Sequence, residues 1–170
     1  MCDEATKART RAEATKERIR AEARDARIRD EAREARIRES FAVQPLMATL
    51  GARLSHVSAG SVAIALPFAA AVRQQHGFIH GGAIMAIADS AAGYAAMSTL
   101  EPGQEVLTIE CKTNFLRPAD GDLVATGAVV RAGRTMVTVT AEVALAASQK
   151  KVAITLATMA VVAGETLGRR

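Results

Sequence analysis

One carboxylate in the sequence has unusual surroundings. Asp89 is the only charged residue between Arg73 and Glu101, in a stretch that is rich in alanine and otherwise largely apolar. Burial of an ionised carboxylate is costly unless the group is well paired, and aspartate is a poor residue for a helix interior. Because such conflicts tend to mark functional positions, we interpret Asp89 as a candidate nucleophile or general base. An aspartate that caps a neighbouring element, or that faces a solvent-filled seam, is the structural alternative.

The start of the same segment is also unusual, because it reads His80-Gly81-Gly82. The first N–H groups of a helix have no partner inside the helix, and glycine lacks the Cβ that would keep a ligand away from them. With the helix dipole behind them, such groups suit an anion or a carbonyl oxygen that becomes one. The alternative is that the glycine pair only makes a tight entry turn.

The spacing of these two features predicts an assembly. Asp89 lies eight residues beyond Gly81, which is about 12 Å along a helix at ~1.5 Å per residue. A nucleophile and an oxyanion donor must both reach one carbonyl group, each at roughly 3 Å. Two antiparallel copies of the helix across a two-fold axis can place Gly81 of one chain beside Asp89 of the other. If the chain is an enzyme, we therefore expect a homodimer with two composite sites.

The elements that position these residues follow from the hydrophobic pattern. A helix over 80–99 is apolar nearly all round, so it must be buried. Runs with period-two alternation or strand-like composition, separated by turn residues, predict an antiparallel sheet with one covered face. The predicted strands cover residues 52–57, 61–66, 105–115, 123–131, 135–145 and 152–162. This order predicts an α+β domain in which the sheet wraps around one long helix.

The first 40 residues differ in composition from the rest. They hold 12 Lys+Arg and 10 Asp+Glu, with a nine-residue repeat that places Ile19, Ile28 and Ile37 on alternating sides of a helix. No apolar stripe results, which argues against a coiled coil or a membrane-binding helix. We predict that 1–40 is a charged helical or disordered repeat segment, with a docking arm as the alternative, and that 41–170 is the folded domain.

Composition excludes several other classes. The net charge is +4 over 170 residues, but acidic and basic residues interleave, so we expect no nucleic-acid partner. Neither a signal peptide nor a membrane span is expected, and two cysteines indicate a reducing, cytoplasmic compartment. His76 and His80 are four residues apart, but no cluster of cysteines or acids completes a metal site. We expect no metal and no cofactor.

Two stretches together resemble a known family. QQHGFIHGGAIMAIADSAAGYAAM is followed by NFLRPADGDLVATGAVVRAGRT, and the set is similar to the hotdog-fold acyl-CoA thioesterases, specifically the PaaI-type branch of phenylacetic acid degradation. The resemblance covers about residues 41–163. It implies the hotdog fold, subunits paired into a continuous sheet, and assembly that is often a homotetramer.

The resemblance also implies roles for individual residues. Asp89 matches the catalytic acid, which acts as nucleophile or as general base toward water, and Gly81 matches the residue whose N–H polarises the thioester carbonyl. His80 matches the motif histidine, which we expect to shape the loop. Gln74 falls where the family has an amide that holds substrate or water, although the PaaI-type branch more often has asparagine there. Gly93 replaces a hydroxyl residue found in one related branch.

The implied reaction is the hydrolysis of an acyl-CoA to a free acid and CoA. Gly82 adds a second N–H in the same turn, and Thr108 is a candidate for a hydroxyl group near the site. Arg131 and Arg134 are candidates for binding the CoA phosphates. The acyl group is left open between an aromatic ring and a medium aliphatic chain, with the PaaI resemblance favouring a phenylacetyl-like group. A hotdog hydratase or dehydratase, and an acyl-CoA-binding protein without turnover, remain as alternatives.

Overall fold

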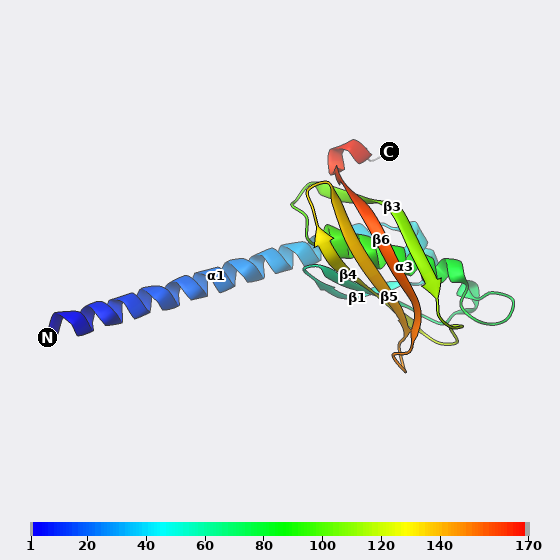
Figure 1. Ribbon diagram of the computed structural model, residues 1–170, viewed down its shortest axis with the longest axis horizontal. Helices are drawn as coiled ribbons and strands as arrows, with labels where there is room; N and C mark the ends of the chain where they lie inside the picture. The colour runs from blue at the N-terminus through cyan, green and yellow to red at the C-terminus, as the bar shows by residue number, and fades with distance from the viewer. Residues whose placement is uncertain (1, 169–170) are drawn as a thin grey trace.

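Six antiparallel strands and one long helix make up the body of the molecule, as the sequence predicts. The computed structural model describes residues 2–168, with side chains from residue 15 onward. The strands form one sheet in the order β1-β2-β4-β5-β6-β3 (Figure 1). Their bounds are Arg53–Ser58 (β1), Ser61–Leu66 (β2), Gln104–Phe115 (β3), Leu123–Ala132 (β4), Met136–Leu145 (β5) and Lys151–Ala163 (β6). Each end of the predicted strands therefore lies within one residue of the observed end.

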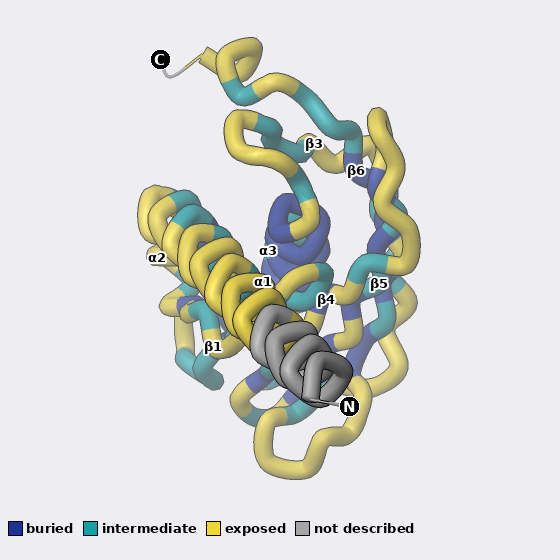
Figure 2. Tube along the Cα trace, turned by 90° about the vertical axis from the view of Figure 1, so that its left-hand side faces the viewer, coloured by how far each residue is buried: buried dark blue, intermediate teal, exposed yellow. Residues whose placement is uncertain are grey.

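Within residues 2–168, three α-helices accompany the sheet. They are α1 (Cys2–Ala42), α2 (Pro45–Leu50) and α3 (Gly81–Met97), and there are short 3-10 turns at Ala70–Val72, before α3, and at Gly164–Leu167. The sheet encloses α3, which is the most deeply buried element in Figure 2. No local pattern in the sequence predicts α2, a helix of six residues with Pro45 at its start and Met47 as its buried residue.

An alanine-rich face fixes α3 against the sheet. Ala88, Ala91, Ala92 and Ala95 are fully buried, and small side chains let the helix backbone approach the strands. The approach is closest at Gly127 of β4, where an added Cβ would lie 2.2 Å from the carbonyl oxygen of Ala91. The position of α3, and of every group it carries, is thus set by direct contact between backbones.

Most of α3 is buried, but one stripe of it remains open in a single chain. Met85 is exposed, and Asp89, Ser90 and Gly93 are half-buried, at a spacing that puts them on one helix face. The neighbouring strand β3 is an edge strand of the sheet. The open stripe and the free edge of the sheet therefore lie on the same side of the molecule.

The N-terminal segment is helical, and its last turns pack on the domain. Ile37 is fully buried, and two arginines bind the carbonyl groups that end α3. The Nε atom of Arg33 donates to the Ser98 oxygen at 2.7 Å, and Nη2 of Arg36 donates to the Met97 oxygen at 2.7 Å. The earlier turns of α1 extend away from the domain in Figure 1. Among the described residues, no helix has the length and hydropathy needed to cross a membrane.

Candidate active site

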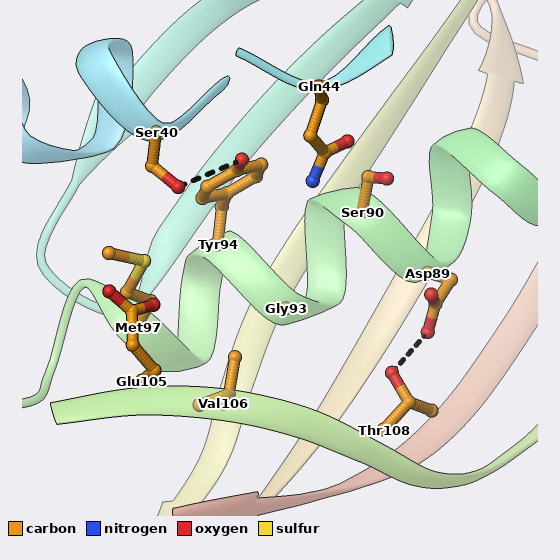
Figure 3. Close-up of a pocket in the computed structure, with 10 residues that line it drawn as sticks. All are labelled: Ser40, Gln44, Asp89, Ser90, Gly93, Tyr94, Met97, Glu105, Val106 and Thr108. Carbon is orange, nitrogen blue, oxygen red and sulfur yellow. Dashed lines mark hydrogen bonds between the residues drawn. The ribbon is translucent and has the colours of Figure 1, made fainter. Parts of the chain in front are cut away.

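The Asp89 carboxylate is held by a single side chain of the neighbouring strand. Oγ1 of Thr108 donates a hydrogen bond to Oδ1 of Asp89 at 2.8 Å (Figure 3). The same hydroxyl oxygen lies 3.4 Å from the sulfur of Met159, which is part of the core. Asp89 accepts no other side-chain hydrogen bond within the described part of the chain. One carboxylate oxygen is therefore oriented by β3, and the other is available to a water molecule or a substrate.

A cavity of about 160 Å³ adjoins this carboxylate along α3. Gly93 lies in its middle, where the missing side chain leaves space between the helix and Val106 of β3 (Figure 3). The residues that line it come from α1, from the turn between α1 and α2, from α3 and from β3. The lining residues are Ser40, Gln44, Asp89, Ser90, Gly93, Tyr94, Met97, Glu105, Val106 and Thr108.

The N-terminus of α3 presents one free backbone donor. His80 is the N-cap, and its Nδ1 accepts a hydrogen bond from the Gly82 N–H at 2.9 Å. The Gly81 N–H has no acceptor among the described residues. The role of His80 remains a prediction, and the observed hydrogen bond occupies the Gly82 N–H. This hydrogen bond leaves Gly81, rather than Gly82, as the donor that can reach a ligand.

Gln74 lies with Gly81 at a second cavity, of about 380 Å³. Oε1 of Gln74 accepts a hydrogen bond from the His76 N–H at 2.5 Å, which leaves the NH₂ group of its amide for another partner. The ring of Phe115 lies against Gly81, with its nearest carbon 3.2 Å from where a Cβ would be. This second cavity therefore combines two hydrogen-bond donors with an apolar wall.

Within one chain the predicted site residues fall into two groups. Asp89 and Thr108 line the first cavity, and Gly81 and Gln74 line the second. The separation follows from their positions on α3, since a rigid helix keeps residues eight positions apart about 12 Å from each other. Each group lacks what the other has: the first holds a carboxylate, and the second holds the N–H that suits a developing oxyanion.

The two predicted phosphate-binding arginines lie outside both cavities. Arg131 is exposed near the end of β4, beside a bulge in its pairing with β5. Arg134 lines an open hollow of about 600 Å³ together with Glu165. Neither arginine has a side-chain ion pair among the residues described. Their binding of phosphate remains a prediction.

Sequence reasoning missed the far end of the first cavity. Ser40 and Gln44 come from the boundary between the repeat segment and the domain, and no local pattern connects them with α3. Glu105 looks like an ordinary surface acid in sequence. Only the packing of α1 onto α3 brings these side chains together.

Burial keeps two weakly acidic groups near the site in their neutral forms. Burial raises the pKa of Tyr94, and its hydrogen bond with Ser40 only partly offsets the effect. Burial also raises the pKa of the Cys111 thiol, and the negative charges of Asp89 and Glu110 raise it further. The Tyr94 phenol is therefore a neutral hydrogen-bonding group at neutral pH.

Comparisons with known proteins show which family and which solved structures this chain resembles. Residues 76–150 match the family model described as Thioesterase superfamily. A solved structure of a thioesterase family protein from Silicibacter pomeroyi is 40% identical, with a TM-score of 0.75, and the match covers 78% of this chain and 99% of that one. The solved PaaI protein of the phenylacetic acid degradation operon of E. coli is 24% identical, with a TM-score of 0.68, over 74% of this chain and 90% of that one. This second likeness concerns the fold.

Two curated relatives match over a shorter region. The 1,4-dihydroxy-2-naphthoyl-CoA hydrolase of Listeria monocytogenes is 30% identical over 90 residues, which are 52% of this chain and 73% of that protein. A relative from Halobacterium salinarum is 33% identical over 96 residues, which are 54% of this chain. The chain spans 64% of the length of that second relative.

Proposed function

The chain belongs to the thioesterase superfamily, and from this membership we propose that it hydrolyses the thioester of an acyl-CoA to a free acid and CoA. The observation that carries the proposal is the Asp89 carboxylate, held by Thr108 beside a cavity on the helix whose first N–H is free. The Listeria relative supports it, because its name states that it hydrolyses a CoA thioester.

The proposed roles follow from the donors and acceptors available. The Gly81 N–H donates to the thioester oxygen as negative charge develops there, and loss of such a donor typically costs ~3–4 kcal/mol. Asp89 either attacks the carbonyl carbon or removes a proton from the attacking water. In the first route the bond to sulfur breaks and an anhydride forms on Asp89. Water then hydrolyses this anhydride to the free acid, which restores the carboxylate, and the proton from this water goes to the CoA thiolate. In the second route the activated water attacks the carbonyl carbon, the bond to sulfur breaks, and the proton held by Asp89 passes to the CoA thiolate. Gln74 helps hold the substrate or the water through its free NH₂ group.

The two groups of residues meet, in this proposal, between two chains. The exposed side chains of Leu107 and Ile109 on β3, and the open stripe of α3, are the surfaces available for a second copy. Pairing of the two chains through these surfaces would bring Gly81 and Gln74 of one chain to Asp89 of the other. A homotetramer built from two such dimers is the further assembly that the family resemblance implies.

For the substrate, we propose an acyl-CoA of aryl or phenylacetyl type. The Listeria relative acts on an aromatic acyl group by its name. Arg131 and Arg134 would bind phosphates of CoA, since guanidinium groups bind phosphate through paired hydrogen bonds.

The first test is the release of free thiol from a panel of acyl-CoAs, including enoyl- and 3-hydroxyacyl-CoAs. A thioesterase releases CoA, whereas a hydratase alters the acyl group and leaves the thioester intact. Binding of the acyl-CoAs with neither reaction would identify a binding protein without turnover.

Asp89→Asn is the matching substitution. We expect it to reduce turnover by ~10²–10⁴-fold, because a neutral amide neither attacks nor accepts a proton. Steady-state kinetics measure the loss, and circular dichroism checks that the fold is intact. Asp120→Asn, which changes an exposed acid outside both cavities, is the control. Near-wild-type hydrolysis by Asp89→Asn would rule out the proposed mechanism.

A further inference from the structure

The cavity beside Asp89 ends at a wall made by the base of α1. Ser40, in the last turn of that helix, lies with its Oγ 3.3 Å from the Tyr94 hydroxyl. Gln44, two residues after α1 ends, lies over Ser90 and Tyr94, and Met97 and Glu105 lie at the same end (Figure 3). An acyl group that extends from Asp89 past Gly93 would therefore meet α1.

Several contacts fix this wall in place. Arg36 binds three carbonyl oxygens at the end of α3 and beyond, those of Met97, Leu100 and Glu101, at 2.7–3.0 Å. Ile37 is fully buried. The ring of Phe41 packs against that of Tyr94, with 5.8 Å between their centroids. The wall is thus held against α3 by several contacts, in contrast to the exposed turns that precede it.

The end of the cavity is polar. Ser40, Gln44, Ser90 and Tyr94 supply hydroxyl and amide groups, and Tyr94 is neutral as described above. Glu105 is half-buried, and among the described residues no side chain donates a hydrogen bond to its carboxylate or forms an ion pair with it. None of the cationic side chains that the structure describes lines the cavity. This end of the cavity can donate hydrogen bonds to a neutral group or accept hydrogen bonds from it. The Glu105 carboxylate repels a second negative charge.

The cavity is also short. Its volume is about 160 Å³, and an apolar cavity of ~150 Å³ holds one benzene molecule. Thr108 and Glu105 are three residues apart on β3, so the distance between the two ends is about 10 Å at ~3.3 Å per residue. When an acyl group lies in an apolar pocket, each methylene added to it strengthens its binding about fourfold. In this cavity the gain in binding should stop once the acyl group is long enough to reach the wall.

We propose that the wall formed by the base of α1, Gln44 and Glu105 determines acyl specificity, so that the protein takes short acyl groups with a neutral hydrogen-bonding end. Long aliphatic chains are blocked by the wall, and acyl groups that end in a carboxylate are repelled by Glu105 and Asp89. The inference rests on the proposed thioesterase activity. It adds that Gln44 and Glu105, which touch neither the thioester nor the oxyanion donor, choose between acyl groups.

The test compares kcat/KM across matched thioesters with the full-length protein. Straight-chain acyl-CoAs from butanoyl to tetradecanoyl measure the effect of length. Hexanoyl-CoA, its ω-hydroxy analogue and adipoyl-CoA measure the effect of the terminal group. We expect kcat/KM to stop rising within the short members of the series. We also expect the ω-hydroxy analogue to exceed hexanoyl-CoA by about tenfold, which is the effect of one hydrogen bond to a charged or buried partner.

Two substitutions assign the effects to the wall. Gln44→Leu keeps the bulk of the side chain, and Gln44 makes no side-chain cap for α2, so the fold should tolerate it. It should reduce the preference for the ω-hydroxy analogue over hexanoyl-CoA. Glu105→Gln should increase adipoyl-CoA hydrolysis by about tenfold as one of two repelling charges is removed. Glu142→Gln, on the sheet face away from α3, should change neither ratio.

The outcomes separate the two proposals. Two results would overturn the role of the wall in acyl specificity and leave the thioesterase function standing. One is a kcat/KM that rises about fourfold per methylene up to tetradecanoyl-CoA. The other is that Gln44→Leu and Glu105→Gln both leave the kcat/KM ratios between the acyl-CoAs unchanged. Hydrolysis of none of these thioesters, nor of the aryl-CoAs in the first panel, would overturn both.

Discussion

The charge of Asp89 acts on more than a bound substrate. Cys111 lies three residues after Thr108 on β3. Burial, and then the negative charges of Asp89 and Glu110, raise the pKa of its thiol. A thiolate beside a carboxylate is disfavoured, so the thiol stays protonated to higher pH than a free cysteine. The ionisation of Cys111 therefore reports on the charge at the proposed catalytic position without any substrate.

The corresponding prediction concerns Asp89→Asn in a Cys2→Ser background, where Cys111 is the single thiol. Removal of the neighbouring negative charge should lower the Cys111 pKa, because its thiolate is then less strongly repelled. The pH dependence of alkylation by iodoacetamide measures this. Asp120→Asn serves as the comparison and should leave the profile where it is. An identical profile in wild type and Asp89→Asn would show that Asp89 carries no charge that Cys111 senses.

Among the elements, α3 depends on one close contact with β4. An added Cβ at Gly127 would lie 2.2 Å from the carbonyl oxygen of Ala91 and 2.8 Å from the nitrogen of Ala92. Both atoms belong to backbone, so neither can move without shifting the helix.

We expect Gly127→Ala to lower the free energy of unfolding by about 3 kcal/mol, at the upper end of ordinary overpacking, because the helix must move off the sheet. Urea denaturation measures the change. Gly121→Ala is a suitable control, since its Cβ would make an ordinary contact of 3.6 Å with Leu145. Equal stability of the two variants would mean that α3 and β4 separate without cost.

The base of α1 gives a second prediction for the elements. Ile37 is fully buried, whereas Ile28, one repeat earlier, is 48% exposed. Ile37→Ala should destabilise the protein by ~2–5 kcal/mol, and Ile28→Ala should change stability by less than ~0.5 kcal/mol. Thermal or urea unfolding distinguishes the two. If both substitutions have equal effects, the last turns of α1 do not belong to the domain.

The boundary predicted after residue 40 falls inside α1, which ends at Ala42. It remains a prediction, and truncation tests it. A chain that starts at residue 32 keeps Arg33, Arg36 and Ile37, whereas one that starts at residue 41 loses all three. A stable chain from residue 41 would support the predicted boundary, whereas an unfolded chain from residue 41 would place the last turns of α1 in the domain.

Local pattern explains which of these elements the sequence predicts. Several strands alternate clearly, and α3 is marked by its glycine pair and its largely apolar sequence, so both follow from a single chain segment. Asp89 follows too, because a lone charge among apolar residues is visible without a structure. The wall of the first cavity does not, because Ser40 and Tyr94 are 54 residues apart and meet only through tertiary packing. Likewise the free Gly81 N–H becomes clear only once His80 is seen to cap Gly82.

For the molecule as a whole, the proposed site requires two chains. Gly81 can be replaced by proline because it is the first residue of α3, where proline is well tolerated. The added Cβ would lie 3.2 Å from the Phe115 ring, so this ring must shift slightly. His80 before it has φ −64° and ψ 136°, which a residue preceding proline readily adopts. Gly81→Pro therefore removes the N–H donor, and the helix keeps its start.

We predict complementation between Gly81→Pro and Asp89→Asn. Each variant alone should be nearly inactive. A mixed dimer, purified through two different tags, has one site with both native groups and one with neither, so it should regain about half of the wild-type activity. Thiol release from an acyl-CoA measures it. If both residues act within one chain, the mixed dimer will be as inactive as its parents.

The projecting part of α1 also affects how the size of the protein must be measured. A helix of 41 residues is about 60 Å long at ~1.5 Å per residue, and most of it stands clear of the domain. Such a particle experiences more friction in water than a sphere of equal mass. Gel filtration against globular standards will therefore overestimate the number of subunits. Sedimentation equilibrium or light scattering, which depend on mass rather than shape, are the methods that can count them.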